Sequence, residues 1–424
     1  MAEPSIERIV GRRVWDSRGR PTVEAEIFLD TGASGRAIAP AGASTGTHEA
    51  VELRDGGLAF GGFGVDRAVA NINGAIAAAL HAMPIADQAA IDRRLIELDG
   101  TSNKVRLGGN ATIAVSLAAL HAAAAARCEP LWRVIAESGQ VSLPMPMIQI
   151  FGGGAHAGRR VDIQDFLIVP IGAASFDQAL AMAAGVYRAG GGIMADRGHL
   201  CGVADEGGWW PEFASNAEAL DTLVEAIERA GLLPGEEVGI AIDVAASQFH
   251  SRGRYRLAAD GAELDTDGLI ELLDSWCRRY PIVSIEDPVA EDDDAGMAAF
   301  TAKLGERIQI IGDDYLVTSA HRVAAAASRG AGNAVLLKPN QAGTVSETKA
   351  ALAAARAVGW RTVVSARSGE TEDVTIVHLA VGWNAGQLKV GSFARSERMA
   401  KWNEGLRIEA ALGPAARFAG WRRK

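Results

Sequence analysis

The chain contains 424 residues, 48% of them hydrophobic, and its formal net charge is -10. This length predicts a barrel-sized domain with a smaller partner domain, and the acidic balance argues against nucleic acid or an anionic membrane as a binding partner, because both call for a basic surface. The sequence has no apolar run near the roughly 20 residues that span a bilayer, and its three cysteines form no CxxC pair, so we expect a cytoplasmic protein from a reducing compartment.

The first 137 residues combine predicted strands with predicted helices. Residues 22–29 alternate apolar and polar side chains, as in a half-buried antiparallel strand, so residues 1 to about 55 are predicted to form a small meander. The small residues at 39–46 (APAGASTG) lie between these strands and predict an exposed, mobile loop. Helical patterns follow from Val65 to about Glu137. Residues 1–137 are therefore expected to form an α+β domain.

A linker near Ser138 begins the second predicted domain, residues 138–424. A second glycine-rich loop occupies 151–160, and apolar strands then alternate with alanine-rich helices. Successive polar strand ends at one rim are typical of a (β/α) barrel, whose chemistry lies at that rim. Polar side chains are expected at these strand ends, at intervals that each fit one βα unit: Glu206, Asp243, Glu286, Asp313, Lys338, Arg367 and Lys389.

Three of these strand ends carry carboxylates that suggest a metal site, namely Asp243, Glu286 and Asp313. An all-oxygen set without Cys or His suits Mg²⁺ or Mn²⁺ and not Zn²⁺. A single carboxylate in such a place is more often a helix cap or a salt-bridge partner. Three at barrel spacing, followed by two lysines and an arginine, favour the metal site.

The remaining strand ends suggest acid–base chemistry on an anionic substrate. Lys338 follows the apolar run AVLL, so burial is expected to lower its pKa toward that of a usable base; a salt bridge to Asp313 is the alternative. Arg367 and Ser368 suit phosphate recognition, and Lys389 suits an anion clamp. With Glu206 as acid, the predicted reaction is β-elimination from a phosphorylated hydroxy acid.

Long motifs in the chain also resemble those of the enolase family. They include DSRGRPTVE, AGASTG, LGGNATIAVSLA, YPIVSIEDPVAEDD, LLKPNQAG, RSGETED and GQLKVGSFARSERMAKWN. The resemblance implies an α/β fold, an enolase-like eight-stranded (β/α) barrel with a smaller N-terminal α+β domain, and a homodimer or higher homo-oligomer. It also implies a Mg²⁺-dependent lyase that converts 2-phosphoglycerate to phosphoenolpyruvate, with a second Mg²⁺ that arrives with substrate.

The resemblance further assigns roles to individual residues. It implies Asp243, Glu286 and Asp313 as ligands of the first Mg²⁺ and Ser44 as a ligand of the second. Lys338 matches the family's base, Glu206 its acid, and Lys389 the contact to the substrate carboxylate. The other implied substrate contacts are Arg367 and Ser368 at the phosphate and His156 in the second mobile loop.

Two departures from the family pattern concern the same site. Ala366 stands where the family has a histidine beside the phosphate, and Gln164-Asp165-Phe166 replaces QEF, which shortens by one methylene the carboxylate that supports the acid. A shift of about 1 Å can cost roughly two orders of magnitude in rate. We therefore keep Asp165 as a catalytic candidate and Gln164 and Ala366 as substrate-binding candidates.

Three functions are compatible with these residues. The first is a sluggish but otherwise ordinary enolase in which water compensates for the lost groups. The second is a paralogue with a phosphonate-type substrate, such as a carboxyphosphonoenolpyruvate synthase of phosphonate biosynthesis. The third is a non-catalytic scaffold descended from an enolase, which predicts broken metal or base positions, whereas the three carboxylates, Lys338 and Glu206 are all present.

Overall fold

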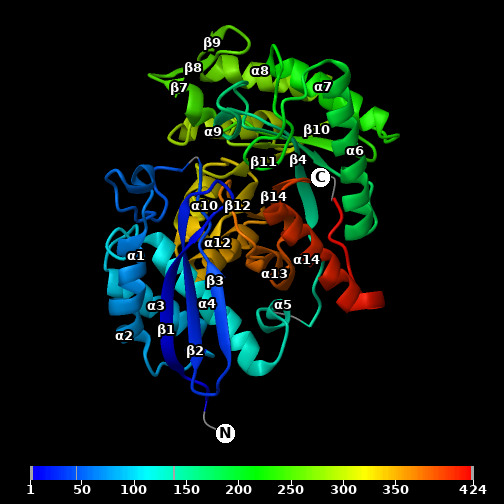
Figure 1. Ribbon diagram of the computed structural model, residues 1–424. Coiled ribbons are helices and arrows are strands. Elements are labelled where there is room, and N and C mark those ends of the chain that lie inside the picture. The colour runs from blue at the N-terminus through cyan, green and yellow to red at the C-terminus, as the bar shows by residue number, and fades with distance from the viewer. Residues whose placement is uncertain (1–2, 44, 137–138, 422–424) are drawn as a thin grey trace.

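The computed structural model describes residues 3–43, 45–136 and 139–421, and it shows a small sheet-and-helix unit beside a closed barrel (Figure 1). The predicted domain boundary, between 137 and 138, lies outside the described residues.

The N-terminal sheet is an antiparallel meander of three strands, β1 (Ile6–Trp15), β2 (Pro21–Leu29) and β3 (Ser34–Ile38). The alternating apolar residues of β2 point into the core, where Val23, Ala25 and Ile27 are buried. Helix α4 (Gly109–Arg127) packs against β2 and β3. The contact requires Gly35 in β3, because a Cβ there would lie 2.0 Å from the backbone nitrogen of Ala122.

Among the described residues, α4 is long and apolar enough to cross a bilayer, but 83% of its most apolar window is buried, as expected for a core helix.

Shorter helices complete this unit. The other helices are α1 (Asp66–Asn71), α2 (Ala77–Leu80), α3 (Gln88–Asp99) and α5 (Leu131–Val134).

The small-residue loop does not lie where the sequence predicts it. It follows β3, the last strand of the meander, and does not separate two of its strands. The expectation of an exposed loop is also wrong in part: Ala39, Ala41 and Gly46 are buried, and Ala43 is exposed. Ala41 and Gly369 exchange backbone hydrogen bonds of 2.9 and 2.8 Å, which join the loop to the barrel rim.

Eight strands close the barrel in the order β10-β11-β12-β13-β14-β4-β5-β6. Its interior is filled by apolar side chains such as Met147, Leu167, Ile311 and Leu336. The strands are β4 (Met145–Gly152), β5 (Asp165–Val169), β6 (Gly239–Asp243), β10 (Ile282–Glu286), β11 (Gln309–Gly312), β12 (Ala334–Leu337), β13 (Arg361–Ser365) and β14 (Gly386–Ser392).

The regular βα repeat predicted from the sequence fails at two places. Strand β5 runs antiparallel to both β4 and β6, because the connection from β4 holds only a short turn, Gly154–Ala157, and parallel neighbours need a longer crossover. Glu206, predicted at a strand end, lies in the loop between α6 (Phe176–Asp196) and α7 (Asn216–Arg229).

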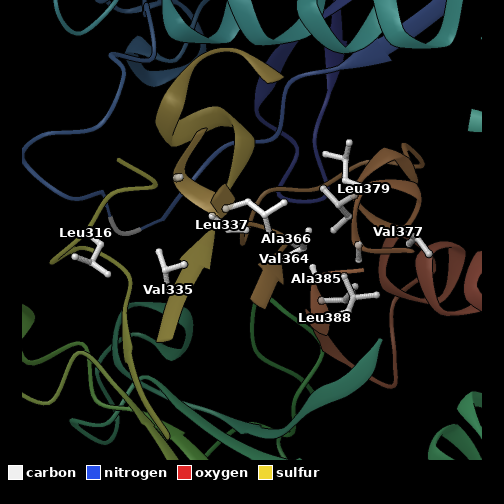
Figure 2. Packing of buried hydrophobic residues seen from close by; sticks show 14 of the residues in the cluster. Leu316, Val335, Leu337, Val364, Ala366, Val377, Leu379, Ala385 and Leu388 are labelled. Atoms are coloured by element: carbon white, nitrogen blue, oxygen red, sulfur yellow. The ribbon is translucent and has the colours of Figure 1, made fainter. Parts of the chain in front are cut away.

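Helices cover the outside of the barrel, and a small sheet of β7 (His250–Ser251), β8 (Arg254–Leu257) and β9 (Ala262–Leu264) lies at one end of the molecule (Figure 1). Figure 2 shows Leu337, Val364 and Ala366 in the apolar cluster around the ends of β12 and β13. The remaining helices are α8 (Thr266–Arg279), α9 (Asp294–Leu304), α10 (Ala320–Ser328), α11 (Pro339–Ala342), α12 (Val345–Ala357), α13 (Thr375–Gly382) and α14 (Ser396–Leu412).

Candidate active site

A small cavity at the rim of the barrel collects most of the predicted site residues. Its volume is about 20 Å³, roughly room for one water molecule, so a larger ligand requires its lining to move. Among the described residues, two predicted ones are not part of the lining: Glu286 and Asp313 adjoin it through their lysine partners. Ser44 lies outside the described residues. The lining consists of Ala43, His156, Gln164, Asp165, Glu206, Asp243, Lys338, Ser365, Ala366, Arg367, Ser368 and Lys389.

Lys389, in β14, lies between two carboxylates that end neighbouring strands. Its Nζ donates to Asp243 Oδ2 at 2.9 Å and to both oxygens of Glu286 at 3.0 and 2.9 Å. Gln164 Nε2 donates to the same oxygen of Asp243 at 2.9 Å. Burial and the charge of Asp243 raise the pKa of Glu286 well above its ordinary value, although Lys389 lies beside it. Two carboxylates therefore share the single ammonium group of Lys389.

Lys338, directly after β12, forms a buried ion pair with Asp313, directly after β11. Burial lowers the pKa of Lys338, but the charge of Asp313 outweighs it, and the net shift is upward. The predicted downward shift is therefore wrong for this arrangement, and the salt bridge that the sequence left as the alternative is the one observed. The apolar run before Lys338 predicts the burial but not the carboxylate that faces the ammonium.

The carboxylates fit a divalent cation. Asp243 and Glu286 share the ammonium of Lys389, and the carboxylate oxygens of Asp287, Asp313 and Asp314 lie within 4.8 Å of one another. Among the described residues, the predicted set of Asp243, Glu286 and Asp313 is not that compact, because lysine ammoniums lie among these carboxylates. Asp287 also supports the strand end, since its carboxylate accepts from the backbone amides of Asp313 and Asp314 at 2.9 and 2.7 Å.

A second group of acid–base side chains lies across the cavity. His156 Nδ1 is 2.9 Å from Asp165 Oδ1, and its Nε2 is 3.7 Å from Glu206 Oε1. Burial opposes protonation of His156, but the two carboxylates outweigh it and raise the pKa to about 9. Asp165 has a lowered pKa because His156 and Lys389 overcome the effect of its burial. Gln149 also donates to Asp165 and fixes its orientation.

Arg367 and Ser368 form the cationic end of the cavity. The two terminal guanidinium nitrogens of Arg367, NH1 and NH2, contact the buried Glu49 at 2.9 and 3.3 Å. NH1 also lies 3.2 Å from Asn340 Oδ1. Ser368 Oγ accepts from the backbone amide of Ala43 at 2.6 Å. Ala366 contributes an apolar wall beside these groups and is 5% exposed.

Sequence reasoning missed several polar residues that complete this network. Glu49 follows the small-residue loop without a periodic signal, and Asn340 and Gln341 come two and three residues after Lys338 in the motif LLKPNQ. Gln341 Nε2 donates to Asp313 Oδ1 at 2.8 Å and to Glu49 Oε1 at 3.3 Å. The motif offered a signal for Gln341, whereas the role of Glu49 follows only from the tertiary structure.

Comparison with protein-family models identifies both halves of the chain. Residues 6–135 match the model described as the enolase N-terminal domain. Residues 140–424 match the model described as the enolase C-terminal TIM barrel domain.

Proposed function

The chain belongs to the enolase family, and we propose that it is a Mg²⁺-dependent carbon–oxygen lyase that removes water from 2-phosphoglycerate or a close analogue. The observation that carries this proposal is the shared cavity. Lys338, the candidate base, and Glu206, the candidate acid, both line it together with Arg367, the candidate anion site. A β-elimination needs these three functions around one small substrate.

The proposed reaction moves two protons. Lys338 Nζ takes the proton from the carbon beside the substrate carboxylate, and the electron pair of that C–H bond moves toward the carboxylate to give an enolate. The same electron pair then forms the C=C bond of the product as the C–O bond to the hydroxyl group breaks. Glu206 gives its proton to the departing hydroxide, which leaves as water. Lys389 binds the substrate carboxylate, and Arg367 and Ser368 bind the phosphate.

Asp243, Glu286 and Asp313 would hold Mg²⁺, which would supply positive charge to stabilise an enolate and would compete with Lys338 for the charge of Asp313. Lys338 must lose its proton before it acts as a base, and its observed pairing with Asp313 opposes that loss. The binding of a second Mg²⁺ at Ser44 is part of the proposal.

A second candidate function is supported by the wall of the cavity. Ala366 is a small apolar residue in the cluster shown in Figure 2, and Asp165 is a short carboxylate committed to His156 and Gln149. Both features favour a paralogue that acts on a larger phosphonate-type substrate, such as a carboxyphosphonoenolpyruvate synthase.

One assay separates the two candidates. The protein is mixed with 2-phosphoglycerate and Mg²⁺, and formation of the enolpyruvate product is followed by its ultraviolet absorbance. Rapid turnover supports the first candidate and refutes the second. Slow turnover that rises in the double variant Asp165→Glu/Ala366→His supports the second. Absence of turnover together with absence of Mg²⁺ binding by calorimetry refutes both and favours the scaffold.

We also propose that the protein is a homodimer with domains 1–137 and 138–424. Sedimentation equilibrium tests the assembly: the monomer mass of 44.3 kDa at all concentrations contradicts it. Limited proteolysis tests the boundary, since a linker near Ser138 predicts a cut there.

A further inference from the structure

Glu49 has a place in the site that the proposed reaction does not use. It is 7% exposed, and its carboxylate contacts the guanidinium group proposed to bind the substrate phosphate. Glu49 Oε2 accepts from Arg367 NH1 at 2.9 Å, and Oε1 accepts from Arg367 NH2 at 3.3 Å. A carboxylate on both terminal nitrogens uses the planar fork with which arginine binds a phosphate group.

Neighbouring groups hold Glu49 in this position. The backbone amide of Gly46 donates to Oε1 at 2.9 Å, and Gln341 Nε2 donates to the same oxygen at 3.3 Å. Gln341 is itself fixed by Asp313 and by the hydroxyl of Thr318. Glu49 is therefore a preorganised anion, held by the small-residue loop and by the metal-side network, and not a surface side chain that drifts past the arginine.

We propose that Glu49 is an internal competitor for Arg367, and that its negative charge sets the affinity and the charge preference of the site for phosphate or phosphonate groups. A bound anion has to share or displace the carboxylate, and in this buried place the two negative charges repel strongly. Glu49 thus weakens the binding of anions in general and favours substrates whose other groups, such as the carboxylate at Lys389, contribute enough binding to overcome the competition.

This inference rests on the proposed function, in which Arg367 binds the anionic group of the substrate. Inorganic phosphate is a direct probe, because it reports on the anion site without any chemical step. Its dissociation constant is measured by calorimetry at constant Mg²⁺ for the parent protein and for Glu49→Gln, Glu49→Asp and Glu52→Gln. Glu49→Gln keeps the size and an acceptor oxygen for Gly46 but removes the charge.

Glu52→Gln is a matched control. Glu52 lies three residues further along the same segment, and the charge of Arg367 opposes the rise in its pKa that burial causes. The carboxylate of Glu52, however, accepts a hydrogen bond from Arg54 NH2 at 2.5 Å. We expect Glu49→Gln to bind phosphate about tenfold more tightly, a typical size for coupling between two sites. Glu52→Gln should bind phosphate as the parent does, and Glu49→Asp, which retains the charge one methylene further from Arg367, should bind it less tightly than Glu49→Gln does.

The outcomes separate this inference from the function on which it rests. The inference is supported if Glu49→Gln binds phosphate more tightly than the parent and Glu52→Gln do. It is also supported if phosphate binding is detected only in Glu49→Gln. Equal or weaker binding in Glu49→Gln overturns it and leaves Glu49 with a structural role. If neither the parent nor Glu49→Gln binds phosphate, the assignment of Arg367 as the anion site fails as well. As a kinetic check, Glu49→Gln should lower KM for a turned-over substrate without raising kcat.

Discussion

Replacing Arg398 by methionine should destabilise the barrel and disturb the anion site together. Arg398 belongs to α14 and is fully buried. Its NH1 donates to the carbonyl oxygens of Arg367 and Val390 at 2.6 and 2.9 Å, and its NH2 donates to that of Ser368 at 2.5 Å. Methionine fits the space but donates nothing, so the variant leaves three buried carbonyl groups without this donor.

The size of the effect follows from these contacts. A buried polar group left without a partner costs about 1–3 kcal/mol, and three carbonyl groups lose their donor here. Partial relaxation and the packing of the methionine side chain reduce the total, so we expect the free energy of unfolding to fall by about 3–5 kcal/mol. Unfolding entropy is about 2.1 cal/mol/K per residue, which over residues 140–424 gives roughly 0.6 kcal/mol/K. The melting temperature should therefore fall by about 5–8 °C if the barrel unfolds as one unit.

The same change should weaken anion binding, because the freed carbonyl groups belong to Arg367 and Ser368 themselves. A displacement of about 1 Å at these residues can cost roughly 10²-fold in activity. Calorimetric unfolding gives the melting temperature, and phosphate titration gives the binding constant. Arg407→Met, on the exposed face of α14, is the control and should change neither quantity. An Arg398→Met variant with unchanged phosphate affinity refutes the proposed support, whatever its stability.

Three further predictions concern the base, the metal and pH. Lys338→Ala should stop exchange of the substrate α-proton with solvent, measured by NMR in D₂O, while phosphate still binds; retained exchange would remove Lys338 as the base. Glu286→Gln should abolish the rise in melting temperature that Mg²⁺ produces in the parent, about 2.7 kcal/mol of stabilisation at 100 times Kd, and an undiminished rise contradicts its role as a ligand. Burial lowers the pKa of His378 from 6.5 to about 4, so that, as the pH falls, this histidine takes up a proton in the unfolded chain before it does so in the folded protein. The free energy of unfolding should therefore decrease by up to about 3 kcal/mol as the pH falls from 6.5 to 4. Denaturant midpoints across this range should depend less on pH in His378→Gln, and an unchanged slope refutes the assignment.

The sequence predicted the barrel well where local pattern and geometry coincide. Asp243 and Glu286 end buried strands, and the carboxyl ends of parallel strands meet at one rim, so their proximity follows from the strand pattern alone. The direction of β5 was not predictable in this way, because an apolar strand looks the same whichever neighbour it joins. Glu206 reaches the cavity from a loop that lacks any strand pattern.

Charge partners were the harder part of the site to predict. The run AVLL indicates that Lys338 is buried, but the direction of its pKa shift depends on Asp313, which comes from the preceding strand. Glu49 and Arg367 come from different domains and are far apart in the sequence, so no local pattern relates them. Burial is a property of a segment, whereas a pKa depends on which charges the fold places nearby.

The pairing of charges decides how the site must work. Among the described residues that line the cavity, Lys338, Lys389, Arg367 and His156 each face a buried carboxylate. An anionic substrate that binds these side chains therefore has to replace buried carboxylates as their ion-pair partners. On the proposed function, Asp313 and Glu286 would hold a divalent cation, which would favour that exchange by leaving Lys338 and Lys389 available for the proton and the substrate. On this proposal anion affinity and metal affinity are linked, and Glu49, which pairs directly with Arg367 and reaches Asp313 only through Gln341, adds a cost to anion binding that a metal would not remove directly.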